Sequence, residues 1–307
     1  MNELQRCAGL NITSSGLQFV EVEKVSEQYL ISNIKQALIN PSINFIDNID
    51  SSSSVQIQNA FDEIKSRNPI TSSLLSFTLP PELFITIQLP YDNNLQHNEV
   101  IEEFRWELSM LFPFQSADEL AVKYYQLGQQ SPPGSTLALV VAVNKKNLLF
   151  CKNFCKKNNI TPRFVDNASV SANYLICNNF RTDIGLRSVN VYYASSLVML
   201  FINNLSKPFF IKEFSRSNKN YLRALAETLS TEQINKIVSH PELKAFVTGE
   251  NINDELISGL NSATGLNFKR FNPFDIFRLK NGIINSSQQD DNLVLFTPAV
   301  GIASRFT

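Results

Sequence analysis

The chain has 307 residues, a formal net charge of −1 at pH 7 and 43% hydrophobic residues. This length suits about two domains of roughly 100–200 residues each. A nearly balanced charge excludes a broad electrostatic field for nucleic acid or anionic membrane. The start of the sequence has no apolar signal segment, no apolar run approaches the ~20 residues of a membrane helix, and the four cysteines lack metal-ligand spacing. We therefore expect a protein of a reducing, aqueous compartment.

Residues 8–23, AGLNITSSGLQFVEVE, predict two strands joined by a tight turn. Apolar residues alternate before the turn and continue after it, as in a strand pair. The turn, Thr13–Gly16, is small and rich in hydroxyl groups, and Gly16 can adopt the left-handed backbone of a tight turn. Such a turn can hold an anion through its N–H groups and hydroxyls, although an ordinary polar hairpin turn has the same composition.

Two later segments extend this pattern. Residues 189–213 read as a second hairpin, with strands VNVYYASSLVMLFI and PFFIKE around a turn at Asn203 and Asn204. Residues 245–260, AFVTGENINDELISGL, read as a strand, a glycine turn and a helix. Two distant hairpins and a late strand–glycine–helix unit resemble the skeleton of the actin-like superfamily. That resemblance implies an α/β fold of the ribonuclease H-like kind, in which two domains face each other across a nucleotide cleft.

Helices and strands alternate between the two hairpins. A strand is expected at 28–39, and a helix at 55–66 repeats apolar residues at helical spacing, with one of the serines at 51–54 as its cap. The other expected elements are strands at 74–77, 83–89, 121–127, 137–143 and 160–166 and helices at 99–114, 145–158, 167–178, 220–229 and 231–239.

The most specific motif lies in the helix expected at 99–114, EVIEEFRWELSMLFPF. Trp106 and Met110 lie off its apolar stripe, which consists of Val100, Phe104, Leu108 and Leu111. An Arg-Trp-Glu centre at 105–107 is followed by a Phe-Pro-Phe stop at 112–114. In this combination the segment resembles a helix of the PilM family, actin-like proteins of type IV pilus assembly, which carries Arg-Trp-Glu and ends in Ile-Pro-Phe.

The resemblance continues in order along the chain. Segments similar to that family are AVKYYQL at 121–127, ITPRFVD at 160–166, NPF at 272–274 and the Ala/Gly-rich TPAVGIASRF at 297–306. The resemblance implies an inserted subdomain of the kind shared with FtsA at 84–160, and a second actin-like domain at 187–296. The first actin-like domain then comprises 1–83, 161–186 and 297–307. A helical subdomain that covers one wall of the cleft in the family is reduced here to 214–244.

The first cleft motif departs from the family. Its first turn reads GIDIGSSS, where this chain has GLNITSSG at 9–16. Asn11 replaces the metal-associated Asp and lacks the negative charge that helps to hold magnesium and phosphate. Thr13 replaces the first turn glycine and adds a branched side chain where backbone should approach phosphate.

The other cleft motifs are also altered. The second turn, 191–196, has neither the Asp nor the Gly of the family, and Gly249 is followed by Glu250 instead of glycine. A carboxylate at that position tends to repel phosphate. We therefore expect no enzyme activity, no bound ATP and no metal. The vestigial cleft comprises Asn11, Thr13, Ser14, Ser15, Gly16, Ser195, Gly249 and Glu250.

The resemblance implies a scaffold at the cytoplasmic face of the inner membrane. It would hold the cytoplasmic tail of a PilN-like bitopic protein in a groove between the first domain and the inserted subdomain, and link it to the motor. Candidate partner-binding residues are Phe104, Trp106, Phe112 and Phe114, each of which is alternatively a core residue. Two other functions stay open: an actin-like ATPase that retains nucleotide binding, and a domain similar to the cytoplasmic domain of GspL, which binds a secretion ATPase.

Overall fold

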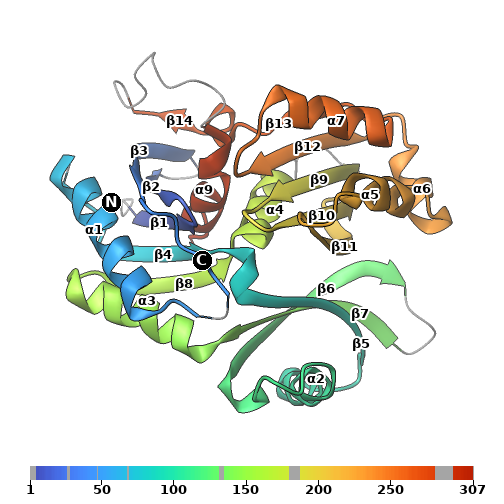
Figure 1. The fold of residues 1–307 in the computed structure, drawn as a ribbon, viewed down its shortest axis with the longest axis horizontal. Helices are drawn as coiled ribbons and strands as arrows, with labels where there is room; N and C mark the ends of the chain where they lie inside the picture. Colours follow the sequence, from blue (N-terminus) through green and yellow to red (C-terminus); the bar gives the residue numbers. More distant parts are fainter. Residues whose placement is uncertain are drawn as a thin grey trace.

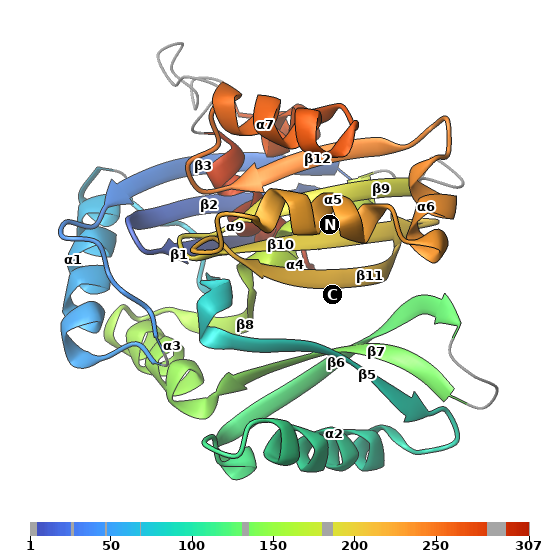
Figure 2. The ribbon, with the colours of Figure 1, turned by 45° about the vertical axis from the view of Figure 1, so that its right-hand side comes forward.

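The computed structural model describes residues 5–306 except 26–27, 47, 68, 131–134, 180–186 and 281–292. Within these residues, two large sheets lie beside each other and a smaller sheet lies below both (Figures 1 and 2). Helices cover the faces of all three sheets.

The first sheet has the strand order β14-β3-β2-β1-β4-β8. β1, β2 and β3 form an antiparallel meander, while β4 and β8 continue it in parallel beside β1 and β14 pairs in parallel with β3. Its strands are β1 (Gln5–Thr13), β2 (Gly16–Val25), β3 (Gln28–Leu38), β4 (Leu74–Leu79), β8 (Thr161–Asn167) and β14 (Arg278–Leu279).

Two helices cover each face of the first sheet. On one face, Leu17 and Phe19 of β2 pack in a core with α1 (Ser51–Arg67) and α3 (Lys145–Lys157). On the other, Val20 and Val22 pack with α4 (Ala168–Asn179) and α9 (Thr297–Ala303). The alternation follows from the two-residue period of a strand, because successive side chains point to opposite faces.

The second sheet has the order β11-β10-β9-β12-β13. Three helices cover one face and share a core with it. Its strands are β9 (Arg187–Tyr193), β10 (Leu197–Asn204), β11 (Lys207–Ser215), β12 (Lys244–Gly249) and β13 (Phe268–Arg270). The helices are α5 (Tyr221–Leu229), α6 (Glu232–Val238) and α7 (Asp254–Thr264).

The third sheet is a separate unit of β5 (Phe84–Asp92), β7 (Ser135–Asn144) and β6 (Leu120–Gln130), paired in that order. One face carries α2 (His97–Leu111). The other face packs on α4 and on the second sheet, so that α4 contributes to the cores of all three sheets. Short 3₁₀ turns complete the chain: η1 (Pro81–Leu83), η2 (Ala117–Glu119), η3 (Pro273–Asp275) and η4 (Val294–Phe296).

The predicted helices and strands occur in the predicted order, and three details are corrected. α1 begins at Ser51 and its first turn is capped by Asp50, whose Oδ1 accepts the Ser53 N–H at 2.7 Å. The turn expected at Asn203 and Asn204 lies at Leu205 and Ser206, which have φ of 53° and 60°. Gly16 does not adopt positive φ; a Cβ there would lie 2.6 Å from the carbonyl oxygen of Ala37.

Two elements pack outside the sheet of the domain predicted for them. α3 falls in the range predicted for the inserted subdomain, yet it buries Phe154 and Cys155 in the core of the first sheet. β14 falls in the range predicted for the second domain, yet it pairs with β3. The predicted boundary at residue 186 lies outside the described residues, and the boundaries as a whole stay a prediction.

Candidate functional site

Turns of the two large sheets meet at the position of the predicted cleft, where one hydrogen bond joins them. From the first sheet, Ser14 Oγ donates to Glu250 Oε2 at 3.3 Å, just after β12. From the junction with the third sheet, Glu82 reaches the turn between β9 and β10. Its Oε1 accepts hydrogen bonds from Ser195 Oγ at 2.9 Å and from Ser196 Oγ and N at 3.0 Å each. The structure therefore brings Ser14, Ser195, Gly249 and Glu250 into one region, together with Glu82, which the sequence did not indicate.

Asn11 is committed to structural hydrogen bonds. It is 1% exposed. Its Nδ2 donates to Gln18 Oε1 at 2.7 Å and to the Leu295 carbonyl at 3.5 Å, while its Oδ1 accepts from Thr78 Oγ1 at 2.8 Å. The amide thus ties neighbouring strands together with both its donor and its acceptor, as buried polar groups must be paired.

The polar groups of the first turn, Thr13–Gly16, likewise form hydrogen bonds within the chain. Thr13 Oγ1 donates to the Gly16 carbonyl at 3.0 Å and closes the turn. The carbonyls of Ser14 and Ser15 accept backbone N–H groups from Ile43 and Ile39, each at 2.8 Å. These contacts hold the segment after β3 against the turn, so the hydroxyl-rich sequence has a structural use here.

Gly249 is required by a close backbone approach. Its φ is +112°, and a Cβ would lie 2.1 Å from the carbonyl oxygen of Tyr193 and 2.7 Å from its nitrogen. The next N–H, of Glu250, donates to the same Tyr193 carbonyl at 2.7 Å. This contact joins the end of β12 to the end of β9 and aims Glu250 into the cleft.

The carboxylates of Glu250 and Glu82 give this region an acidic character. Burial, and then the charge of Glu82, raise the pKa of Glu250 to about 7, against the lowering effects of the Ser14 hydrogen bond and Arg216. Burial and Glu82 also raise the pKa of Glu213. Glu82 Oε2 is buried without a hydrogen-bond partner. A phosphate entering here meets carboxylates that already repel one another, which disfavours a nucleotide.

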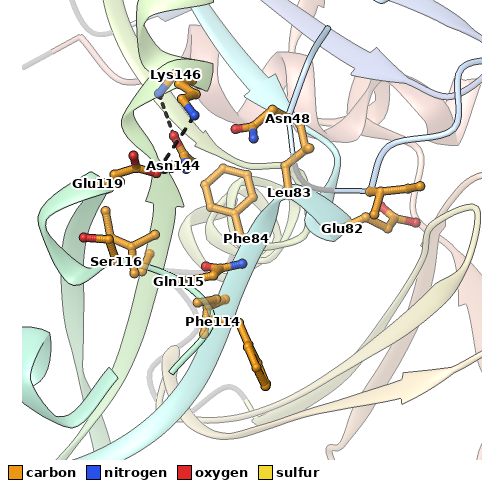
Figure 3. Close-up of a pocket in the computed structure, with 14 residues that line it drawn as sticks. Asn48, Glu82, Leu83, Phe84, Phe114, Gln115, Ser116, Glu119, Asn144 and Lys146 are labelled. Atoms are coloured by element: carbon orange, nitrogen blue, oxygen red, sulfur yellow. Dashed lines mark hydrogen bonds and ion pairs between the residues drawn. The ribbon is translucent and has the colours of Figure 1, made fainter. Parts of the chain in front are cut away.

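A second site, a groove, lies between the first sheet's loops and the third sheet. It encloses about 350 Å³, and in Figure 3 the ring of Phe84 stands in its middle. At one end Lys146, Asn144 and Glu119 form a polar cluster in which Asn144 Nδ2 donates to Glu119 Oε2 at 3.4 Å. At the other end lies Phe114, whose side chain is fully exposed. The remaining walls include Ile46, Asn48, Leu83, Ile85, Gln115, Ser116, Leu120 and Ala142.

The four predicted partner-binding residues separate into three environments. Phe104 is fully buried between α2 and the third sheet, with Tyr91 and Tyr124 rings at 5.9 and 5.4 Å, and Phe112 packs partly buried on the same core. Phe114 borders the groove. Trp106 is 64% exposed on another face of α2. Phe84 lies in the predicted strand 83–89, which the resemblance to the PilM family places near the partner groove, whereas Asn144, at the end of β7, is a groove residue that the sequence did not indicate.

Two further findings concern the described part of the chain. No helix in it is long and apolar enough to cross a membrane. No group of three or more His, Cys, Asp or Glu side chains among the same residues is arranged to hold a metal ion.

The sequence by itself has no close match: no protein-family model matches it, and no curated protein matches it. The fold, however, defines a class, since paired sheets around a cleft form the actin-like fold. A Bacteroides thetaiotaomicron protein of actin-like ATPase fold and unknown function superposes with a TM-score of 0.52 and 12% identity, over 88% of this chain and 91% of that one.

A more extensive match is a chain of the PilM–PilN type IV pilus biogenesis complex. It superposes with a TM-score of 0.77 and 15% identity, over 97% of both chains. The cytoplasmic domain of EpsL, an inner-membrane component of the Vibrio cholerae type II secretion system, gives a TM-score of 0.49 and 10% identity over 81% of this chain and 84% of that one. The resemblance to PilM indicated by the sequence is thereby confirmed at the level of the fold.

Proposed function

We propose that this protein is a non-catalytic scaffold of a type IV pilus or related secretion system. In this proposal it binds the tail of a PilN-like inner-membrane protein at the cytoplasmic face of that membrane and links the tail to the motor. The observation that carries the proposal is the groove bordered by Phe84 and Phe114, in a fold that matches a chain of the PilM–PilN complex along nearly the whole length of both chains.

The groove has the chemistry that an extended peptide tail requires. Phe84, Phe114 and Ile46 offer apolar surface for alternate side chains of the tail. Asn144, Glu119 and Lys146 supply donors and acceptors at one end for its backbone or terminus. A fully exposed Phe114 gains burial only when something covers it, which is typical of a binding anchor.

The cleft supports the non-catalytic part of the proposal. Ser14, Ser195 and Ser196 already donate to carboxylates of the same chain. Asn11 has no charge to offer a metal, and its amide is fully engaged. We therefore propose that the protein neither binds nor hydrolyses ATP.

Titration calorimetry of the full chain tests both parts. A synthetic PilN N-terminal tail should bind with micromolar affinity, and Phe114→Ala should weaken it by about tenfold or more, because a central aromatic anchor is removed. Trp106→Ala is the matched control, since it removes an exposed aromatic outside the groove. Equal affinity of the wild type and the Phe114 variant would contradict the proposed groove.

The two alternatives predict other results in the same experiment. Heat of binding with Mg-ATP, followed by phosphate release, would favour an actin-like ATPase. The absence of any heat of binding with either ligand, together with capture of a type II secretion ATPase, would favour a role like that of the GspL cytoplasmic domain.

A further inference from the structure

α2 presents an outward face whose side chains are exposed to solvent. The helix lies on the outer side of the third sheet, away from the two large sheets (Figures 1 and 2). Its inward face is buried through Val100, Phe104 and Leu108, at spacings of four residues. On the opposite side of the helix Glu99, Glu102, Trp106 and Met110 are exposed to solvent along one stripe, and Glu103 and Glu107 lie half-buried along one flank of this face.

The end of this stripe is unusually apolar for a surface. Trp106 is 64% exposed and Met110, one turn later, is 66% exposed. Leu111, beside them at the end of the helix, is 51% exposed. A large aromatic ring and a flexible thioether adjacent on a surface are characteristic of protein-binding hot spots, since each gains burial only in a complex.

The rest of the stripe is acidic. α2 contains Glu99, Glu102, Glu103 and Glu107, no lysine and a single arginine, Arg105, whose Nη1 pairs with Glu102 at 2.6 Å. Glu103 Oε2 is buried without a hydrogen-bond partner. Burial, and then the charge of Glu103, raise the pKa of Glu107. The carboxylates beside Trp106 therefore crowd one another, and a cation between them would relieve that repulsion.

We infer that the outward face of α2 is a docking surface for a basic amphipathic segment of a partner protein. Its apolar residues would cover Trp106 and Met110, and its lysines or arginines would pair with Glu103 and Glu107. The acidic stripe excludes an anionic lipid surface, which would be repelled. This surface is separate from the groove at Phe114, so the inference does not depend on the proposed function.

Trp106 is the only tryptophan of the chain, so its fluorescence reports directly on this face. The probe is an acetylated Leu/Lys peptide of about 14 residues with apolar residues at helical spacing. Binding to the full chain should shift the Trp106 emission to the blue, because the ring leaves water. An otherwise identical Leu/Glu peptide should give no shift.

Variants distinguish binding at this surface from non-specific binding of the peptide. Glu103→Gln with Glu107→Gln should weaken the Leu/Lys peptide by about tenfold or more, and Met110→Ala should weaken it similarly. Phe114→Ala, in the groove, is the matched control and should leave the affinity unchanged. All these side chains are exposed or half-buried, and circular dichroism verifies that each variant is folded.

Three results would overturn the inference. The first is equal binding of the Leu/Glu peptide, and the second is unchanged affinity of the Leu/Lys peptide for the charge variant. The third is a blue shift with phosphatidylglycerol vesicles that exceeds the shift with the peptide, since that would make this face a membrane contact.

Discussion

Glu82 and Glu250 place their own carboxylates where the hydroxyl and N–H groups of two turns converge in the cleft. A carboxylate accepts hydrogen bonds much as a phosphate oxygen does. The Ser196 N–H and the Ser195 and Ser196 hydroxyls all donate to one oxygen of Glu82. The donors of that turn are thus satisfied within the chain, and a phosphate would have to displace a group of its own charge.

The raised pKa of Glu250 predicts a pH-dependent stability. The folded-state pKa is about 7, against an ordinary value of 4.5. Below the ordinary value the group is protonated in both states, and its contribution to stability is complete. As the pH rises from about 4.5 to 7, the unfolded chain releases the proton that the folded chain retains, so the free energy of unfolding falls, by roughly 3 kcal/mol in all.

Urea denaturation of the wild type and Glu250→Gln at pH 5 and pH 8 measures this effect. The variant should be more stable than the wild type at pH 8 by roughly 2 kcal/mol and should lose most of that advantage at pH 5. Glu232→Gln, whose side chain is 85% exposed, should show no such pH-dependent difference. A stability difference between wild type and Glu250→Gln that does not change with pH would contradict the assignment.

Gly249 offers a second prediction at the residue scale. Gly249→Ala combines a positive φ with a Cβ 2.1 Å from the Tyr193 carbonyl, so it should reduce the free energy of unfolding by about 2–4 kcal/mol. Gly265→Ala has positive φ but open space and should cost about 1 kcal/mol. Gly259→Ala, inside α7, should stabilise by about 0.5–1 kcal/mol. If urea denaturation gave the same loss of unfolding free energy for Gly249→Ala and Gly265→Ala, the close approach of Gly249 to the Tyr193 backbone would be unimportant for stability.

At the scale of elements, α3 contributes more to the first sheet than its basic sequence indicates. Phe154 is buried, with the rings of Phe61 and Phe77 at 4.9 and 5.7 Å. Phe154→Ala should therefore lower the free energy of unfolding by about 3–5 kcal/mol through lost contacts and a cavity. Leu149→Ala, on the same helix but 54% exposed, should change it by less than about 1 kcal/mol. A thermal or urea melt in which both variants behave alike would place α3 outside this core.

The order of the elements could be predicted from the sequence because each depends on local periodicity. Trp106 and Met110 were placed off the buried stripe of α2 for that reason, and the structure confirms it, whereas Leu111, which was assigned to the stripe, is 51% exposed at the end of the helix. Contacts between distant segments could not be predicted in this way. Glu82 lies 113 residues before its partner Ser195, in a segment that reads only as a proline-rich break. The groove likewise depends on how the third sheet is positioned, which no single stretch specifies.

At the scale of the whole molecule, the cleft is held closed by contacts between elements of different sheets. Ser14 joins Glu250, and Glu82 joins the turn after β9. Behind them, Thr248 Oγ1 lies 2.9 Å from both Val294 O and Thr297 Oγ1, within hydrogen-bond distance of each, and so connects β12 to η4 and α9. η1 belongs to both sites, since Glu82 accepts hydrogen bonds from the turn after β9 and, together with Leu83, also lines the groove. The same short element, η1, therefore borders both the groove, where a partner tail would bind, and the cleft.

This arrangement predicts that Mg-ATP does not stabilise the protein. At about 5 mM nucleotide and a dissociation constant above that concentration, the free energy of unfolding increases by less than about 0.4 kcal/mol, which moves Tm by less than about 1 °C.

A double variant, Glu82→Gln with Glu250→Gln, keeps the side-chain shapes and removes both charges. A Tm rise with Mg-ATP in the variant alone would assign the exclusion to electrostatics, because only charge has changed. No rise in either protein would assign it to the turns themselves, where Asn11 and Thr13 are committed to their own chain. A rise of several degrees in the wild type would instead contradict the self-occupied cleft and favour a nucleotide-binding protein.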